Sequence, residues 1–241
     1  MSILGVKSIP LMKETNRAWK TVPAFYFADR KRSWASIRQH ANSRGYEALI
    51  NLGSVNLDTA AINIPVYNSA DTIRAISTPT ALRRTLGDFI PPVSMDGGPH
   101  WHKRGGYGGE GKVFHDEGDG GCRYWDQPGW DRQEHIEGPE FRVVTVGEKV
   151  VQAARKGARR TKRNGRNDFE YTWIGVEGVK KGGFIPLLKE AVGQIPGGDM
   201  SIIGWDMLSS VDGPFIIEAN TSPGVNEATA NRIAVEVRNL L

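Results

Sequence analysis

The segment of residues 200–224 constrains the fold of this chain more than any other part of the sequence. It holds two apolar runs separated by a turn-forming cluster, SSVDG at 209–213, which predicts two adjacent antiparallel strands. Side chains alternate between the faces of a strand, so Glu218 and Asn220 share one face and the hairpin brings Asp206 opposite them. Oxygen donors of this kind suit Mg²⁺. The same pattern also fits a solvated strand whose polar side chains face water.

The composition is that of a globular protein with one concentrated patch of charge. Apolar residues make up 39% of the chain, and no apolar run approaches the roughly 20 residues that cross a bilayer, so we expect a cytoplasmic protein without a membrane span. The single cysteine, Cys122, excludes an intramolecular disulfide. Net charge is only +4, but residues 155–166 hold seven Lys or Arg and no acid. Such a run is typical of a solvated loop, and it also fits attraction of phosphates, acidic peptides or nucleic acid.

Two parts of different composition follow each other along the chain. In the first, strands expected at 22–27 and 47–52 flank a helix expected at 31–44, which is the order of a small α/β unit. A short helix is expected at 80–86, and we place a boundary near Pro91-Pro92, with residues 1–92 as an N-terminal domain and residues 93–241 as a second domain. Closely spaced strand-like segments predict a mainly antiparallel sheet in the second part. Its expected elements are strands at 99–104, 112–115, 131–136, 140–146, 149–155 and 168–174, and helices at 184–192 and after an Asn226 cap.

A glycine-rich loop with a lysine before it is a candidate phosphate site. Glycine lets several backbone N–H groups turn toward an anion, while the side chain of Lys103 adds a point charge. The loop is neither a Walker nor a Rossmann motif, because no Gly-Lys-Ser/Thr follows and no helix opens after it. An ordinary hairpin tip explains the same glycines. They are Gly105, Gly106, Gly108, Gly109 and Gly111.

A candidate nucleotide hinge follows at residues 133–142, where an extended segment breaks at Gly138-Pro139 and a strand resumes. The backbone around Glu134 and Ile136 is suited to pair with the edge of an adenine. The carboxylate of Glu140, past the break, is suited to accept hydrogen bonds from ribose hydroxyls.

These motifs, in this order and spacing, resemble the ATP-grasp superfamily of carboxylate-amine ligases. The likeness covers residues 99–232 and is nearest to D-alanine:D-alanine ligases and ribosomal-protein glutamate ligases, whose hinge-Gly-x-Glu-aromatic and Asp…Glu-x-Asn-x-x-Pro-Gly patterns match. It implies an α+β chain with the ATP-grasp fold, in which two α/β subdomains with mainly antiparallel sheets clasp ATP after a small α/β N-terminal unit. Residues 93–241 then contain a central nucleotide-lid subdomain and a C-terminal metal-binding subdomain.

The resemblance also implies a reaction and a set of roles. The γ-phosphoryl group of ATP moves to a substrate carboxylate, and an amine attacks the acyl phosphate to give an amide, ADP and phosphate. The implied ligands are Lys103 and the loop 105–111 for phosphate, Glu134 and Ile136 for adenine, Glu140 for ribose, and Asp206, Glu218 and Asn220 for Mg²⁺.

Two arginines are implied to be catalytic. Arg155 is expected on the same side of its strand as Val151 and Ala153, near the strand end, where it reaches the acyl phosphate. Arg142 is expected to help with substrate or phosphate.

The chain departs from the family pattern in its first part. At the ATP-facing lysine expected near residues 80–86, only Arg83 or Arg84 is available, and arginine is not equivalent to lysine at a point contact. The N-terminal part is also short for the family, which suits a peptide or protein end as substrate.

The leading function is therefore an ATP-dependent, ADP-forming ligase that joins a carboxylate to an amine. The alternative is a nucleotide-binding or kinase-like ATP-grasp protein without ligase activity. An RNA-binding module is disfavoured, because the basic run has no interleaved aromatics before Phe169, Tyr171 and Trp173, which alternate on one face of an expected strand. The sequence carries no signal for an oligomeric state.

Overall fold

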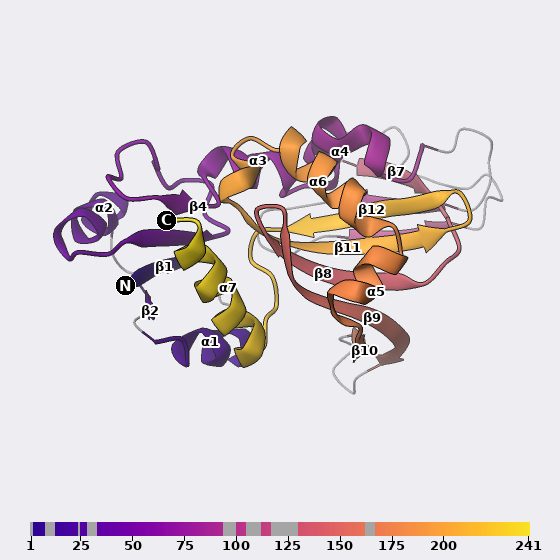
Figure 1. Ribbon diagram of the computed structural model, residues 1–241. Helices are drawn as coiled ribbons and strands as arrows, with labels where there is room; N and C mark the ends of the chain where they lie inside the picture. The colour runs from indigo at the N-terminus through magenta and orange to yellow at the C-terminus, as the bar shows by residue number, and fades with distance from the viewer. Residues whose placement is uncertain are drawn as a thin grey trace.

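The chain folds into two lobes that lie side by side, and both of its ends lie in the same lobe (Figure 1). The structure is a computed structural model. It describes residues 2–7, 13–23, 25–27, 33–93, 100–104, 112–116, 130–161 and 167–241.

The N-terminal lobe is built on a parallel sheet of strand order β2-β1-β3-β4. Its elements are β1 (Ile3–Lys7), α1 (Lys13–Lys20), β2 (Phe25–Phe27), α2 (Trp34–Ser43), β3 (Ala48–Leu52) and β4 (Val66–Tyr67). Parallel neighbours need crossover connections; α1 lies between β1 and β2 and α2 between β2 and β3, whereas β3 is joined to β4 by residues 53–65 without a helix. The sequence predicted β2, α2 and β3 of this α/β unit, whereas β1 and α1 were not predicted.

Two short helices connect this lobe to the next one. They are α3 (Ala70–Ile76) and α4 (Pro79–Leu86), followed by the 3₁₀ turn η1 (Gly87–Phe89). Thr78 caps α4 by accepting the backbone N–H of Ala81, and Pro79 opens the helix. Leu82 and Leu86 are buried in the same apolar core as Trp205, so α4 packs with the second lobe although it precedes Pro91-Pro92.

The second lobe contains two antiparallel sheets. A three-stranded sheet has the order β6-β5-β7, and a five-stranded sheet has the order β10-β9-β8-β11-β12. The strands are β5 (His100–Arg104), β6 (Lys112–Asp116), β7 (Trp130–Glu134), β8 (Glu140–Val146), β9 (Lys149–Thr161), β10 (Asn167–Trp173), β11 (Ile202–Ser210) and β12 (Gly213–Asn220). The hairpin predicted from residues 200–224 is the β11–β12 pair.

The helices of this lobe are α5 (Gly175–Lys181), α6 (Phe184–Gln194) and the 3₁₀ turn η2 (Gly198–Met200), whereas α7 (Glu227–Asn239) returns to the N-terminal lobe and packs beside α1 (Figure 1). As predicted, Asn226 caps α7 by accepting the backbone N–H of Thr229. No helix within the described ranges is long and apolar enough to cross a membrane.

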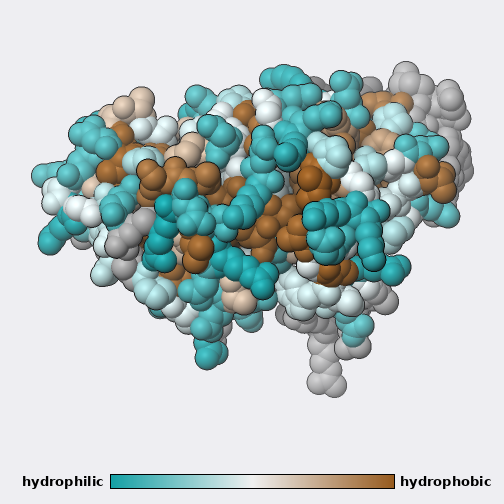
Figure 2. Space-filling view, in the orientation of Figure 1, coloured by the Kyte–Doolittle hydropathy of each residue, from teal (hydrophilic) through white to brown (hydrophobic). Residues whose placement is uncertain are grey.

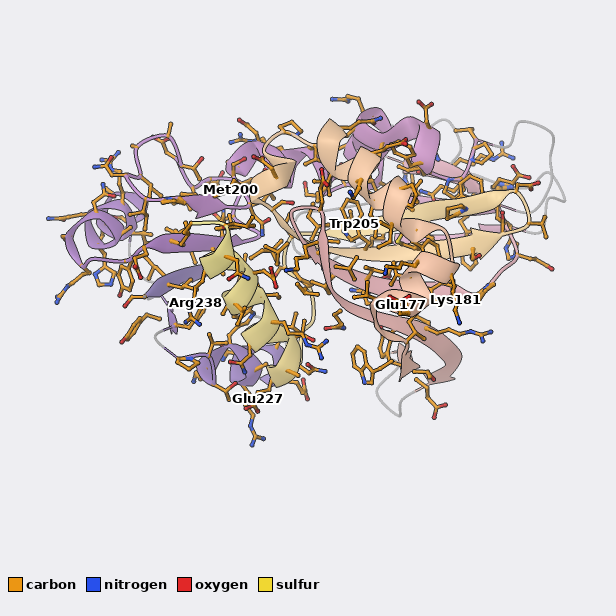
Figure 3. The ribbon with its side chains drawn as sticks, viewed as in Figure 1. Glu177, Lys181, Met200, Trp205, Glu227 and Arg238 are labelled. Atoms are coloured by element: carbon orange, nitrogen blue, oxygen red, sulfur yellow. The ribbon has the colours of Figure 1, made fainter. Side chains whose placement is uncertain are left out.

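The two faces of the five-stranded sheet have different partners. One face packs on α5 and α6 through Val143, Ala153 and Trp205, and Figure 3 labels this buried tryptophan beneath the helices. Half of the other face, including Val144 and Ile202, packs against α7 and the N-terminal sheet. In Figure 2 apolar residues gather in the middle of the visible face, where the two lobes meet, with polar residues around them.

Alternation along β8 and β11 places polar residues on this second face, beyond its packed half. Arg142 is two residues before Val144, and Asp206 is four residues after Ile202. The two polar residues are direct register partners. The site described next lies there.

Candidate active site

The predicted oxygen donors meet on one face of the sheet. Asp206 on β11 is directly opposite Glu218 on β12, and Asn220 is opposite Gly204, so all three side chains share that face. Asn220 Oδ1 accepts the backbone N–H of Ser222 at 2.7 Å, which closes the turn after β12.

Arg142, which is expected from the sequence to help with substrate or phosphate, lies beside this cluster. It is opposite Asp206 on β8 and forms an ion pair with it; the second contact, between Arg142 Nη2 and Asp206 Oδ2, is 3.0 Å. Burial, the largest single influence, lowers the pKa of the guanidinium, but the charges of Asp206, Tyr171 and Glu218 and the hydrogen bond to Asp206 together outweigh it. The pKa of Arg142 is therefore raised, and this residue stays cationic.

Lys156 is a second cation in the site, and sequence reasoning missed it. Its Nζ lies 2.7 Å from Asp206 Oδ2 and 3.1 Å from Glu140 Oε2, and only 6% of its side chain is exposed. Its sole sequence signal was membership of the basic run that begins at Arg155.

Arg155 lies on the opposite face of β9. It is the register partner of Phe141, whose ring packs on Phe184 of α6, whereas its neighbour Ala154 is the partner of Arg142. The alternation assumed from sequence is broken by a bulge near Val151, which packs toward α7 while Ala153 packs toward α6. The structure therefore does not bring Arg155 together with Asp206, and its exposed side chain points away from the site.

Lys103 reaches the site from the other sheet. It is the fourth of the five residues of β5, and its Nζ donates to the carbonyl of Ile217 at 3.0 Å. Ile217 is the extra residue of a bulge, because Asp206 pairs with Glu218 and the next residue, Met207, pairs with Ile216. Burial lowers the pKa of Lys103 to about 8, although the charge of Glu218 and further carboxylates opposes the shift.

Glu218 is the carboxylate least engaged by cations in the site. Burial by the surrounding protein disfavours the charged form of Glu218, and the nearby Asp206 charge acts in the same direction, so the pKa of Glu218 is raised. The charges of Arg142 and Lys103 oppose the shift. Its side chain nevertheless remains accessible to solvent. An accessible carboxylate with an unfavourable charge is suited to receive a cation.

The hinge candidates lie between β7 and β8. Glu134 ends β7 and donates its backbone N–H to Pro92, and Ile136 lies in the connection that follows. Glu140 opens β8, where its carboxylate accepts from Lys156. Gly138 is required by close approach, because a Cβ there would lie 2.0 Å from the backbone oxygen of Ser209.

The remaining candidates lie elsewhere or outside the described ranges. The five loop glycines, 105–111, and the basic residues 162–166 are outside them. Arg83 is occupied by an ion pair with Asp131 on β7 and by the carbonyls of Pro91 and Arg132, so it fastens α4 to the three-stranded sheet. Arg84 is exposed on α4.

The donor set fits Mg²⁺. No group of three or more His, Cys, Asp or Glu side chains forms a metal cluster in the part of the chain that the structure describes. Asp206, Glu218 and Asn220 instead offer hard oxygen donors without a closed cage, and Mg²⁺ commonly takes one or two carboxylates with phosphate oxygens and waters. This set matches a cation that arrives with a nucleotide.

Comparison with known proteins shows the fold. No protein-family model matches the sequence, and no curated protein matches it significantly. Solved structures do match: D-alanine–D-alanine ligase from Bacillus anthracis has a TM-score of 0.66 at 14% identity, covering 100% of this chain and 99% of that chain. The ATP-grasp ligase PsnB, complexed with a minimal precursor, has a TM-score of 0.62 at 15% identity over 98% and 99%. L-amino acid ligase from Bacillus licheniformis has a TM-score of 0.62 at 14% identity over 97% of this chain and 74% of that chain. The chain therefore has the ATP-grasp fold of the α+β class, as its sequence predicted.

Proposed function

We propose that this protein is an ATP-dependent ligase that joins a carboxylate to an amine through an acyl phosphate, with Mg²⁺ as cofactor. One observation carries the proposal: Asp206 and Glu218 form an acidic pair that three cations from different strands surround. Those cations are Lys103, Arg142 and Lys156. Solved neighbours with this fold include a D-alanine–D-alanine ligase complexed with ATP and PsnB complexed with Mg and ADP, which supports the same ligands here.

The charges of the site suit phosphoryl transfer, which depends mainly on positioning and on neutralising charge. Mg²⁺, held by Asp206, Glu218 and Asn220, would screen the phosphate oxygens. Lys103 and Lys156 approach from opposite sheets and would hold the phosphate chain between them.

The reaction proposed at this site has two bond exchanges. A carboxylate oxygen of the substrate attacks the γ-phosphorus, the bond to the β–γ bridging oxygen breaks, and ADP leaves. The amine nitrogen then attacks the acyl carbon, the carbon–oxygen bond to phosphate breaks, and one proton is released. Arg142 and Lys156, which both form ion pairs with Asp206, would stabilise the negative charge that develops in both steps.

Hydroxylamine trapping tests this proposal. With ATP, Mg²⁺ and a panel of candidate carboxylates, an acyl phosphate yields a hydroxamate, and ADP accumulates only with the carboxylate that gives it. ADP release without any carboxylate, or a phosphorylated hydroxyl product, would instead support the nucleotide-binding or kinase-like alternative.

The carboxylate substrate is proposed to be the end of a peptide or protein. On β10, at the edge of the sheet, Tyr171 and Trp173 are 41% and 55% exposed, and their rings stack at a centroid distance of 6.4 Å. Tyr171 is the register partner of Lys156, so this aromatic pair extends the site face to the sheet edge. An aromatic or aliphatic peptide side chain there would place a neighbouring carboxylate near Lys156. The solved PsnB structure holds a precursor, which is consistent with such a substrate.

Peptide binding can be measured without ATP. A fluorescein-labelled pentapeptide with a central phenylalanine between glutamates serves as probe in an anisotropy titration. Each aromatic contact contributes about 0.5–1.5 kcal/mol, so Tyr171→Ser or Trp173→Ser should raise its Kd roughly two- to tenfold. Tyr26→Ser, at a 52% exposed tyrosine of the other lobe, is the control and should leave Kd unchanged. Equal Kd values for all three variants would refute docking on β10.

A further inference from the structure

Asn68 links the N-terminal lobe to the metal end of the site. It follows β4 directly, is fully buried, and has a φ of 61°, the one positive φ outside glycine in the described ranges. Asparagine tolerates this left-handed conformation better than most residues. A buried residue in this conformation is retained only where its contacts hold it.

The hydrogen bonds of Asn68 join three segments that are distant in sequence. Its Oδ1 accepts the backbone N–H of Ile202 at 2.7 Å, at the start of β11. Its Nδ2 donates to the carbonyls of Asn51 and Thr221, each at 3.1 Å. Its own backbone N–H donates to the carbonyl of Met200 at 2.9 Å, at the junction of the two lobes in Figure 3.

This pattern needs an asparagine. The amide supplies an acceptor and two donor hydrogens at one place. Glycine would permit the backbone conformation but lacks the amide, and aspartate lacks the donors.

Thr221 is the residue immediately after Asn220, so the hydrogen bond that fixes its carbonyl also restrains the position of Asn220, the proposed metal ligand. The same short segment is held from two other sides. Ser222 donates its backbone N–H to Asn220 Oδ1, and Pro223 packs so closely over Gly204 that a Cβ there would lie 2.7 Å from the proline Cβ. The exit of β12 is thereby clamped.

We propose that Asn68 is a positioning residue that sets Asn220 relative to Asp206 and Glu218, so that the N-terminal lobe completes the metal site without providing a ligand. Asn68 holds the start of β11 and the end of β12 at once, four residues before Asp206 and one after Asn220. It therefore fixes the spacing of the two strands that carry the donors. The inference rests on the proposed metal site and adds a residue to it.

Mn²⁺ affinity of the full chain tests this role. Electron paramagnetic resonance would measure free Mn²⁺ in the presence of a non-hydrolysable ATP analogue. Calorimetry in EDTA would measure affinity for the analogue without metal, and urea titration would measure stability. Asn68→Gly keeps the backbone conformation and should weaken Mn²⁺ binding about tenfold or more, as expected when an outer partner of a metal ligand is lost. Metal-free affinity for the analogue should stay within about twofold of wild type.

Asn51→Ser is the matched control. Asn51 is equally buried, and among the described residues its side chain bonds the backbone N–H and carbonyl of Ser54 in the turn after β3. The contact of Asn51 with Asn68 is made by its backbone carbonyl, which the substitution retains. It should lose stability without losing Mn²⁺ affinity. Gly204→Ala displaces Pro223 from the other side and should reproduce the Mn²⁺ defect even if Asn68→Gly does not fold.

Each remaining outcome overturns the inference. Wild-type Mn²⁺ affinity in folded Asn68→Gly, or in Gly204→Ala, shows that the exit segment does not set the metal ligand. An equal Mn²⁺ defect in Asn51→Ser shows that lost stability, and not positioning, is the cause. Failure of the wild type itself to bind Mn²⁺ with the analogue overturns the proposed metal site along with the role of Asn68.

Discussion

Lys156 and Arg155 are adjacent residues on opposite faces of one strand, so exchanging each for methionine separates two accounts of the proposed catalytic cation. Sequence reasoning favours Arg155, whereas the structure places Lys156 on Asp206 and Glu140. Methionine keeps most of the aliphatic stem and removes the charge. We expect Lys156→Met to lose activity and Arg155→Met to keep it.

The size of the loss follows from the contacts of Lys156. Its Nζ makes charge-assisted bonds of 2.7 Å and 3.1 Å from a side chain that is 6% exposed. A hydrogen bond to a charged group contributes about 1.5–3 kcal/mol, so removing this cation from the transition state lowers kcat/KM about ten- to a hundredfold. The free energy of unfolding should change by less than about 2 kcal/mol, because Asp206 keeps its ion pair with Arg142.

Carboxylate-dependent ADP release gives kcat/KM, and urea titration gives stability. Arg155→Met should stay within about twofold of wild type in both, as an exposed side chain away from the site. An equal or larger loss in Arg155→Met would refute the assignment of faces on β9 and restore the sequence-based role of Arg155. Unchanged kinetics in both variants would show that neither Arg155 nor Lys156 on β9 is the catalytic cation.

Three further predictions concern the site. Glu218→Gln should lower metal-dependent turnover at least tenfold yet raise stability at pH 7, because the raised pKa of Glu218 makes its ionisation costly in the folded state. Asp206→Asn should instead lose both turnover and about 1–3 kcal/mol of stability, since Arg142 and Lys156 each lose an ionic partner. Calorimetry should show that the affinity for ATP without metal falls as pH rises through about 8, where Lys103 loses its proton. Lys103→Ala should bind ATP about ten- to a hundredfold more weakly at pH 7 and should lose this pH dependence. If the variant keeps the pH dependence, Lys103 is not the group that contacts phosphate. Gly138→Ala should impair ATP affinity and stability, because its Cβ meets the Ser209 carbonyl. Gly45→Ala is the control for the loss of a glycine without a clash, because nothing lies within 4 Å of a Cβ at that position. A larger loss of ATP affinity in Gly45→Ala than in Gly138→Ala would argue against a packed hinge.

Local patterns determined the elements that carry the proposed metal donors. Strand alternation and a turn cluster were enough to pair Asp206 with Glu218 and to place Asn220 on the same face, because both depend only on residues within one hairpin. The Asn226 cap of α7 was equally readable, since capping is a contact between a side chain and the next turn. Order and spacing of the motifs also indicated the ATP-grasp fold.

Only the tertiary structure decided which cations face those donors. A bulge near Val151 breaks the phase of β9, so counting residues could not give the face of Lys156. A second bulge presents the Ile217 carbonyl to Lys103 from another sheet, and Asn68 reaches Thr221 across 153 positions of sequence. Such contacts depend on where distant strands lie in space, and periodicity within a single element holds no information about that. The sequence by itself therefore determined the fold and the acidic half of the site, and packing between distant segments decided the cationic half.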